Sequence, residues 1–210
     1  MPGFAWGRKA PVALSVELPI FPLNAVLFPG GVLPLRVFEA RYVDMTRDCM
    51  KSGKPFGVAL IREGGEVGAP AIPEAVGTTA AIADWDMQQL GVLNLSTVGQ
   101  NRFRIASSAV AANGLITARV EIIAEPPSCE VPAENRVCVT LLRAIASQVG
   151  DKHLPPPHHF GDAAWVGYRL SEFLPIPLAA KQRLLELDDS VSRLQILTKY
   201  LEQHGLAIGK

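Results

Sequence analysis

The sequence predicts an α+β protein in which a β-rich part, residues 15–125, is followed by a helical part, residues 126–210. From residue 56 to residue 125, apolar and polar residues alternate with the period of two that is typical of half-buried strands. After Pro126-Pro127 the apolar residues recur at helical spacing instead. Several short strands joined by short turns predict a meander that curls into a barrel or pseudo-barrel, with one helix inserted.

The β-rich part begins with an apolar stretch, Leu18–Leu35, that contains four prolines and two adjacent glycines. Proline fixes φ and donates no hydrogen bond, so neither a continuous strand nor a helix can run through this stretch. We expect a buried extended path with a tight turn at Phe28-Pro29-Gly30-Gly31, in which one glycine has a positive φ. Residues 1–14 are expected to form a loose arm.

The inserted helix is predicted over Val37–Ser52, because Phe38, Tyr42 and Cys49 lie at helical spacing and Gly53 follows as a C-cap. Asn113-Gly114 is a hairpin signal in the strand region. The strands are predicted at Phe56–Ile61, Val76–Trp85, Leu90–Val98, Arg102–Ile105 and Leu115–Ala124.

The helical part is predicted to hold four helices. Asp162 stands where an N-cap is expected, and the prolines at 155–157 exclude regular structure from the loop before it. The predicted helices are Glu134–Val149, Asp162–Phe173, Leu178–Leu187 and Asp189–His204.

Charge, hydropathy and cysteine content argue against several classes of protein. The chain has 20 basic and 20 acidic residues and shows no basic stripe, so we expect neither a nucleic-acid partner nor an anionic membrane surface. No run of residues is apolar enough to span a bilayer. Cys49, Cys129 and Cys138 form no CxxC pair, which favours free thiols in a reducing compartment and a cytoplasmic protein.

Several motifs, taken in order, are similar to the N-terminal domain of Lon proteases. The similarity covers residues 15 to about 204. The motifs are Leu-Pro-Ile-Phe-Pro-Leu (18–23), Leu-Phe-Pro-Gly (27–30), Leu-Pro-Leu (33–35), Phe-Glu-Ala-Arg-Tyr (38–42), Val-Gly-Thr (76–78), Gly-x-x-Arg-x-Arg-Ile (99–105) and the helical tail at 184–194.

This resemblance implies a PUA-like β pseudo-barrel followed by a C-terminal α-helical bundle. It also implies a domain that captures unfolded or tagged protein substrates, while a separate ATPase and peptidase act on them. The sequence holds no Gly-x-x-x-x-Gly-Lys-Ser/Thr phosphate loop, no serine peptidase motif and no paired CxxC zinc module like that of cereblon-like relatives. We therefore expect a free-standing, non-enzymatic domain without cofactor or metal, whose partners are client proteins or peptides, a protease or a chaperone.

Trp85 and Met87 are the candidate peptide-binding residues, because they place large apolar side chains near an acidic hairpin tip. The alternative is that Trp85 packs on a neighbouring strand or on the helical part. Arg102 and Arg104 offer a basic strand face, which leaves a PUA-like RNA- or small-ligand-binding module as the alternative function.

Catalytic and metal sites find little support in the sequence. His153, His158 and His159 cluster in one loop, but no cysteine or carboxylate stands at ligand spacing within it. The pair of carboxylates around Trp85, Asp84 and Asp86, is interpreted as solubilising a hairpin tip rather than as an acid–base pair. Ser107-Ser108 has no histidine at an assignable position. The sequence alone does not locate the binding surface or the oligomeric state.

Overall fold

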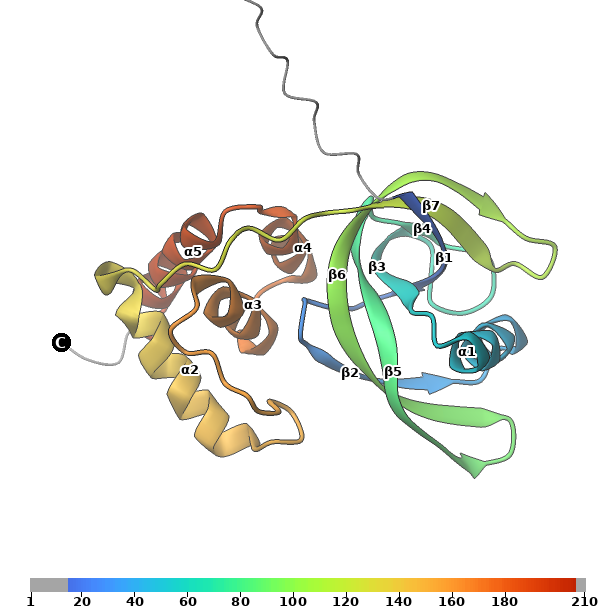
Figure 1. Cartoon of the computed structure of the whole chain (residues 1–210), viewed down its shortest axis with the longest axis horizontal. Helices are drawn as coiled ribbons and strands as arrows, with labels where there is room; N and C mark the ends of the chain where they lie inside the picture. Colours follow the sequence, from blue (N-terminus) through green and yellow to red (C-terminus); the bar gives the residue numbers. More distant parts are fainter. Residues whose placement is uncertain (1–14, 207–210) are drawn as a thin grey trace, which may run out of the picture.

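The computed structural model describes residues 15–206, and the predicted arm at residues 1–14 lies outside them. The strands and α1 gather on one side of the molecule and helices α2–α5 on the other, with an extended connector running between them (Figure 1). The strands are β1 (Ser15–Leu23), β2 (Val32–Val37), β3 (Phe56–Glu63), β4 (Ile72–Pro73), β5 (Val76–Gln89), β6 (Val92–Val110) and β7 (Ile116–Ile122). The helices are α1 (Ala40–Ser52), α2 (Arg136–Val149), α3 (Ala163–Phe173), α4 (Leu178–Glu186) and α5 (Ser190–Gln203), with a 3₁₀ turn at Ala133–Asn135.

The strands pair in the order β1-β7-β6-β5-β3-β4. β1 also pairs with β3 in parallel, with Ile20 opposite Gly57, so the ladder from β1 through β7, β6, β5 and β3 returns to β1. The other pairs are antiparallel. Two predicted strands, Leu90–Val98 and Arg102–Ile105, are parts of the single strand β6, because pairing with β5 continues through Gly99 after a register shift.

The predicted turn in the proline-rich stretch is confirmed. The Gly31 N–H donates to the Phe28 carbonyl at 2.9 Å, and Gly30 has a φ of +74°. Pro29 and Gly30 thus occupy the two central positions at which a type II turn favours proline and glycine. The turn follows the irregular segment 24–28 after β1 and directs the chain into β2.

Helix α1 packs its predicted apolar stripe, including Tyr42, Met45 and Cys49, into the core beside β1 and β3. Gly53 ends it with a left-handed φ of +66°, as expected. The prediction was wrong for Phe38, whose side chain is 53% exposed. The helix begins at Ala40, so Phe38 precedes it and lies off the buried stripe.

The N-cap predicted at Asp162 is confirmed, and Asp189 adds a second N-cap in the helical part. The Asp162 side chain accepts a hydrogen bond from the Trp165 N–H at 2.7 Å and begins α3. Asp189 caps α5 in the same way through the N–H of Ser192.

A buried arginine joins the β-rich and helical parts. Arg102 on β6 is completely buried, and its Nε donates to Glu125 Oε1 at 2.7 Å. Its Nη1 donates to the carbonyls of Leu185 and Leu187 at 2.9 and 3.0 Å and lies 3.2 Å from Asp188 Oδ1. One guanidinium therefore holds the end of the sheet, the start of the connector and the end of α4 together.

A second contact between the parts is made at the turn that precedes β2. Arg169 on α3 donates through Nη2 to the Pro29 carbonyl at 2.7 Å and to Glu172 Oε1 at 3.0 Å. A Cβ added at Gly31 would lie 1.9 Å from that same Oε1 atom, so the carboxylate rests directly on the glycine. Burial raises the pKa of Glu172 to about 7, although Arg169 and Lys181 act to lower it.

Candidate functional site

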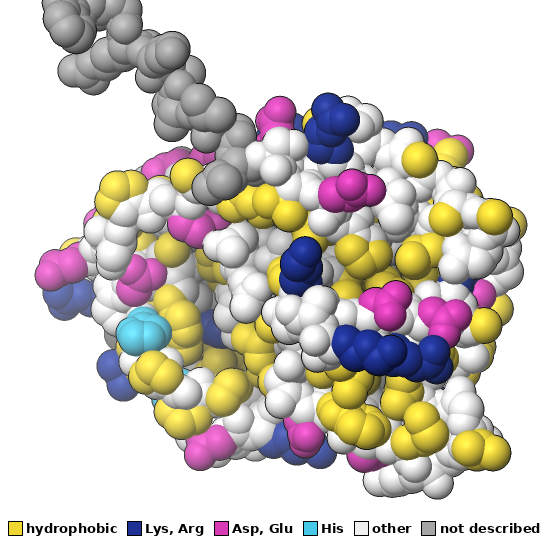
Figure 2. Space-filling model, turned by 45° about the vertical axis from the view of Figure 1, so that its right-hand side comes forward, with side chains coloured by type: hydrophobic (Ala, Val, Ile, Leu, Met, Phe, Trp, Pro, Cys, Tyr) yellow, Lys and Arg dark blue, Asp and Glu magenta, His cyan; other side chains and the backbone are white. Residues whose placement is uncertain are grey.

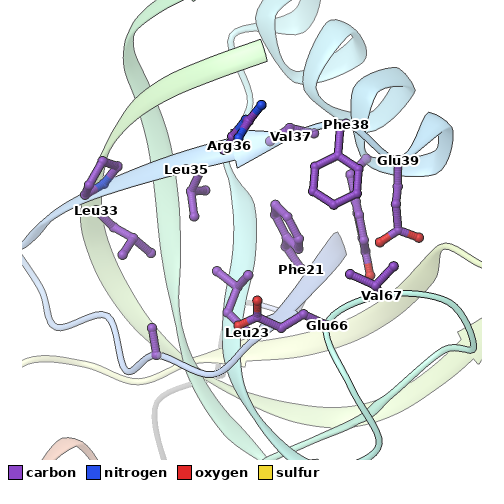
Figure 3. A pocket seen from close by; sticks show the side chains of 13 residues that line it. Phe21, Leu23, Leu33, Leu35, Arg36, Val37, Phe38, Glu39, Glu66 and Val67 are labelled. Atoms are coloured by element: carbon purple, nitrogen blue, oxygen red, sulfur yellow. The ribbon is translucent and has the colours of Figure 1, made fainter. Parts of the chain in front are cut away.

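A pocket of about 380 Å³ opens between β2, the end of β1, the start of α1 and the loop from β3 to β4. In Figure 3 Leu33 and Leu35 of β2 point toward Phe21 and Leu23 of β1 across it, whereas Arg36 points away. The apolar side chains that line it include Phe21, Leu23, Leu33, Leu35, Phe38 and Val67.

β2 borders this pocket with an edge that no described strand pairs. The Gly99 N–H donates to the Gly31 carbonyl at 2.9 Å, and Thr97 Oγ1 donates to the Leu33 carbonyl at 2.7 Å, so the backbone of residue 33 faces β6. Hydrogen-bonded positions recur at every second residue of an antiparallel pair. The even-numbered residues 32–36 therefore direct their backbone groups away from β6, and Pro34 stands at one of these outward positions, where its missing N–H costs no ladder bond.

Two apolar side chains stand exposed at the mouth of the pocket. Phe38 is 53% exposed and Val67 is 63% exposed. The loop that carries Val67 is tied to the end of β1, because the Asn24 N–H donates to Glu66 Oε1 at 2.6 Å. This hydrogen bond holds Val67 at the mouth of the pocket, so the mouth presents exposed apolar surface.

Charged side chains at the pocket have partners within the fold. Glu39 pairs with Arg41 at 3.0 Å, and the Arg36 Nη2 donates to Gln89 Oε1 at 3.3 Å. Burial raises the pKa of Tyr42, with Arg41 acting in the opposite direction, so its phenol stays neutral at physiological pH. The arrangement is suited to burying an apolar ligand rather than to transferring protons.

Trp85 and Met87 lie elsewhere. They are 50% and 45% exposed near the end of β5, close to the hairpin tip at Leu90-Gly91. Trp85 pairs with Leu95 and lines a different cavity, of about 300 Å³, beside the C-terminal end of α1. Neither residue lines the β2 pocket, and their role in peptide binding stays a prediction.

The predicted basic strand face is not formed. Arg104 is exposed, but Arg102 is completely buried, because its guanidinium bonds to Glu125 and to carbonyls of the helical part. On the face drawn in Figure 2, charged side chains of both signs are scattered among hydrophobic ones, and neither sign covers a broad area.

The clustered histidines have neighbours of a structural kind. His158 Nε2 lies 2.9 Å from the Leu154 carbonyl, and its ring lies 5.4 Å from that of Phe160 and 6.0 Å from that of Trp165. Within residues 15–206, no group of three or more His, Cys, Asp or Glu side chains is arranged to hold a metal ion.

The remaining candidate residues make local contacts. Asp84 Oδ1 accepts from the Trp85 N–H at 2.9 Å, and Asp86 Oδ1 accepts from Asn94 Nδ2 at 2.9 Å. Ser107 and Ser108 are exposed, and no histidine or cysteine is found among the described residues that line the cavity beside them. The three cysteines are free thiols, as expected.

Residues 17–203 match the family model of the ATP-dependent protease La (LON) substrate-binding domain. The chain belongs to this family. No helix in the described part of this Lon substrate-binding domain is long and apolar enough to cross a membrane.

Individual relatives agree with the family match. Lon protease 2 of Myxococcus xanthus is 28% identical over 203 residues, which cover 89% of this chain and 23% of that protein. Lon protease of Escherichia coli K12 is 27% identical over 89% of this chain. Cereblon of Danio rerio is 31% identical over 113 residues, or 52% of this chain. The chain spans about a quarter of the length of these curated relatives.

Solved structures match the architecture. A Lon N-terminal domain protein from Xanthomonas campestris superposes with a TM-score of 0.75 at 37% identity, covering 88% of this chain and 98% of that one. The N-terminal domain of Lon from the Mycobacterium avium complex has a TM-score of 0.64 at 19% identity, which shows the shared fold alone. The observed sheet of mostly antiparallel strands and five α-helices is therefore that of Lon N-terminal domains.

Sequence reasoning missed the pocket. It assigned Phe38 to the buried stripe of the helix, and it treated the stretch that contains Leu33 and Leu35 as a closed, buried path. A usable signal was Pro34, because a proline inside an apolar strand favours an edge position.

Proposed function

We propose that this Lon substrate-binding domain recognises exposed apolar segments of non-native client proteins through the β2 pocket. The observation that carries the proposal is that the pocket is open and apolar, with Phe38 and Val67 more than half exposed at its mouth. Apolar side chains that are buried in a folded client become available when the client unfolds, so such a pocket discriminates non-native from native chains.

The size of the pocket sets the expected affinity. Burial of one large apolar side chain contributes about 1.5–3 kcal/mol, so two or three such side chains contribute roughly 3–9 kcal/mol before the costs of association. Because those costs are subtracted from this gross energy, we expect dissociation constants of about 1 μM or weaker. Weak, reversible capture is suited to a domain that passes clients on to a partner, which we take to be a protease or a chaperone of the cytoplasm.

The fold supports the same proposal. We assign the closed ladder of β1, β7, β6, β5 and β3 to the PUA-like pseudo-barrel class and the helices after Pro132 to a bundle that buttresses it. The RNA-binding alternative loses its main support, because Arg102 is buried in the contact between the two parts.

A binding titration tests the proposal. Fluorescence anisotropy of labelled, reduced and carboxymethylated α-lactalbumin, which stays unfolded, should report saturable binding, whereas the native protein with its disulfides intact should not compete. Phe38→Ser with Val67→Ser should weaken binding at least fivefold. Val110→Ser is the matched control, since Val110 is 58% exposed and lies outside the pocket.

Two outcomes of this titration contradict the proposal. One is the absence of saturable binding by the wild-type domain. The other is equal weakening by the pocket variant and by Val110→Ser. A third variant, Trp85→Ser with Met87→Ser, tests the surface that the sequence predicted, and it should leave the affinity unchanged if the β2 pocket is the binding site.

A further inference from the structure

A second cavity continues the β2 pocket toward the helical part. It has a volume of about 280 Å³ and is lined by Val32 and Leu33 on one side and by Phe173 and Leu178 on the other. Ala25 and Leu33 line both cavities, so the two are adjacent along β2. Together the two cavities extend along the whole of β2, from Val37 to Val32.

We propose that the unpaired edge of β2 receives an extended client segment as an additional β-strand. This inference rests on the proposed function and specifies its binding mode. Val32 and Arg36 direct both of their backbone groups outward and Pro34 directs its carbonyl outward, by the register described above. A partner strand can pair with these groups as strands do in β-augmentation, and six residues of β2 offer about 20 Å of edge.

The shape of the site defines the side chains of the occupant. In an added strand, successive side chains point to opposite faces, so every second one would enter the cavities beside Leu33 and Leu35. The occupant is therefore a segment of six or seven residues with apolar side chains at alternate positions. It is not an amphipathic helix, because a helix leaves no backbone groups free to pair with the edge.

Charges at the two ends of the groove complement an occupant of opposite polarity. Glu66 lies at the end near α1, and Lys181 lies at the end near α3, where its Nζ donates to the Glu172 carbonyl at 2.7 Å. Arg36, at the first end, is engaged with Gln89. Glu172 also lines the end near α3 and offsets the charge of Lys181, so the residue that faces Glu66 decides the strand direction, and a basic residue at that position is favoured.

Pro34 argues against a second copy of β2 as the occupant. When two β2 strands pair with each other, each contributes a proline that has no N–H to donate, so two ladder bonds are lost. A client segment without proline loses only one. The edge of β2 is therefore better suited to pair with a client segment than with the β2 strand of a second copy.

Backbone methylation tests strand addition directly. The probes are two fluorescein-labelled peptides, Lys-Thr-Val-Thr-Val-Thr-Glu and its reverse, Glu-Thr-Val-Thr-Val-Thr-Lys, in which the charged residues lie on the same face of the strand as the valines. We expect one of them to bind at least threefold more tightly. In that peptide, N-methylation of one alternate set of amides should weaken binding at least tenfold and methylation of the other set less than twofold, because only one set faces β2.

Variants of the edge provide the matching test on the protein. Arg36→Pro removes an outward N–H, whereas Arg36→Ala removes the same side chain and keeps that N–H. We expect Arg36→Pro to weaken peptide binding at least fivefold relative to Arg36→Ala, with melting temperatures within about 2 °C of each other. A variant that fails this stability criterion is replaced by the methylated peptides, which leave the protein unchanged.

The outcomes separate the two proposals. In the first outcome, the unfolded protein binds and the pocket variant binds it more weakly, but the two sets of methylated peptides bind equally and so do Arg36→Pro and Arg36→Ala. Strand addition is then wrong and the proposed function stands. If neither the unfolded protein nor the peptides bind, the proposed function itself is wrong. A dimer of the free domain that dissociates in Arg36→Pro, measured by sedimentation, assigns the edge to a second copy and overturns the inference.

Discussion

The turn that precedes β2 offers a sharp test of how the helical part holds the sheet. Replacing Gly31 by alanine adds one methyl group, whose carbon would lie 1.9 Å from Glu172 Oε1 and 3.0 Å from the Phe28 carbonyl oxygen. The Glu172 side chain must therefore move away. Its carboxylate then leaves Arg169, whose guanidinium is 3% exposed and keeps only the Pro29 carbonyl as a described partner.

The cost of this change follows from the pair that it separates. Breaking a buried ion pair by removing one partner costs about 3–5 kcal/mol. Glu172 is 20% exposed and can reach water after it rotates. We therefore expect a cost below that range, about 2–3 kcal/mol, for Gly31→Ala. For a chain of this length that free energy corresponds to a fall in Tm of roughly 4–12 °C.

Two other glycines separate the physical causes. Gly30→Ala should cost about 1–2 kcal/mol for a different reason, because a φ of +74° disfavours any side chain while the nearest atom is at an ordinary 3.6 Å. Gly161→Ala should cost less than about 0.5 kcal/mol, since its added Cβ meets no atom within 4 Å and its φ is not in the left-handed region.

Urea denaturation followed by circular dichroism measures these free energies, and a double-mutant cycle with Glu172→Ala tests the mechanism. In the Glu172→Ala background the clash is absent, so Gly31→Ala should cost at least 1 kcal/mol less than in the wild type. The reasoning is refuted if Gly31→Ala costs the same in both backgrounds.

Three further predictions concern two residues in the contact between the parts, Arg102 and Glu172, and one helix cap, Asp162. Arg102→Met should lower the free energy of unfolding by about 3–5 kcal/mol, because it leaves Glu125 Oε1 and the Leu185 carbonyl without their described donor, whereas Arg104→Met on the same strand should change it by less than about 0.5 kcal/mol in the same urea titration. Burial raises the pKa of Glu172 from 4.5 to about 7, so the folded state binds this proton more tightly, and its stabilising effect is complete below about pH 4.5 and is lost as the pH rises through about 7. Relative to Glu172→Gln, the wild type should lose at most about 3 kcal/mol over that range, and parallel stability profiles of the two proteins would contradict this. Asp162→Ala should cost about 1 kcal/mol through the lost N-cap of α3, and Asp162→Asn, which can still accept the hydrogen bond, should recover most of it in thermal melts.

Local features of the fold could be predicted because each depends on a few neighbouring residues. The turn at Gly30, the cap at Gly53 and the N-cap at Asp162 are set by backbone conformation and by short-range hydrogen bonds. The alternation of residues with a period of two likewise predicted half-buried strands, and burial alternates in this way along the first half of β6. The proline-glycine motifs predicted the family, which the comparison with Lon domains confirmed.

The sites of contact depended on residues far apart in the chain, and there the sequence was insufficient. Arg102 looks like an exposed strand residue in its own neighbourhood, and only the approach of Leu185 and Leu187, more than 80 positions away, converts it into a buried anchor. Phe38 fits a helical stripe by spacing, yet the strand β2 delays the start of the helix and leaves its ring exposed.

The sequence by itself therefore determined the family, the order of the helices and the turn at Gly30, since these follow from sequence motifs, from periodicity and from the backbone preferences of glycine and proline. Only the tertiary structure decided that β2 keeps an unpaired edge beside an open apolar pocket. Whether a strand edge is covered depends on which distant segments reach it, and here β1 pairs with β3 and β7 rather than with β2. That choice of partners is a property of the closed ladder as a whole, and no local pattern encodes it.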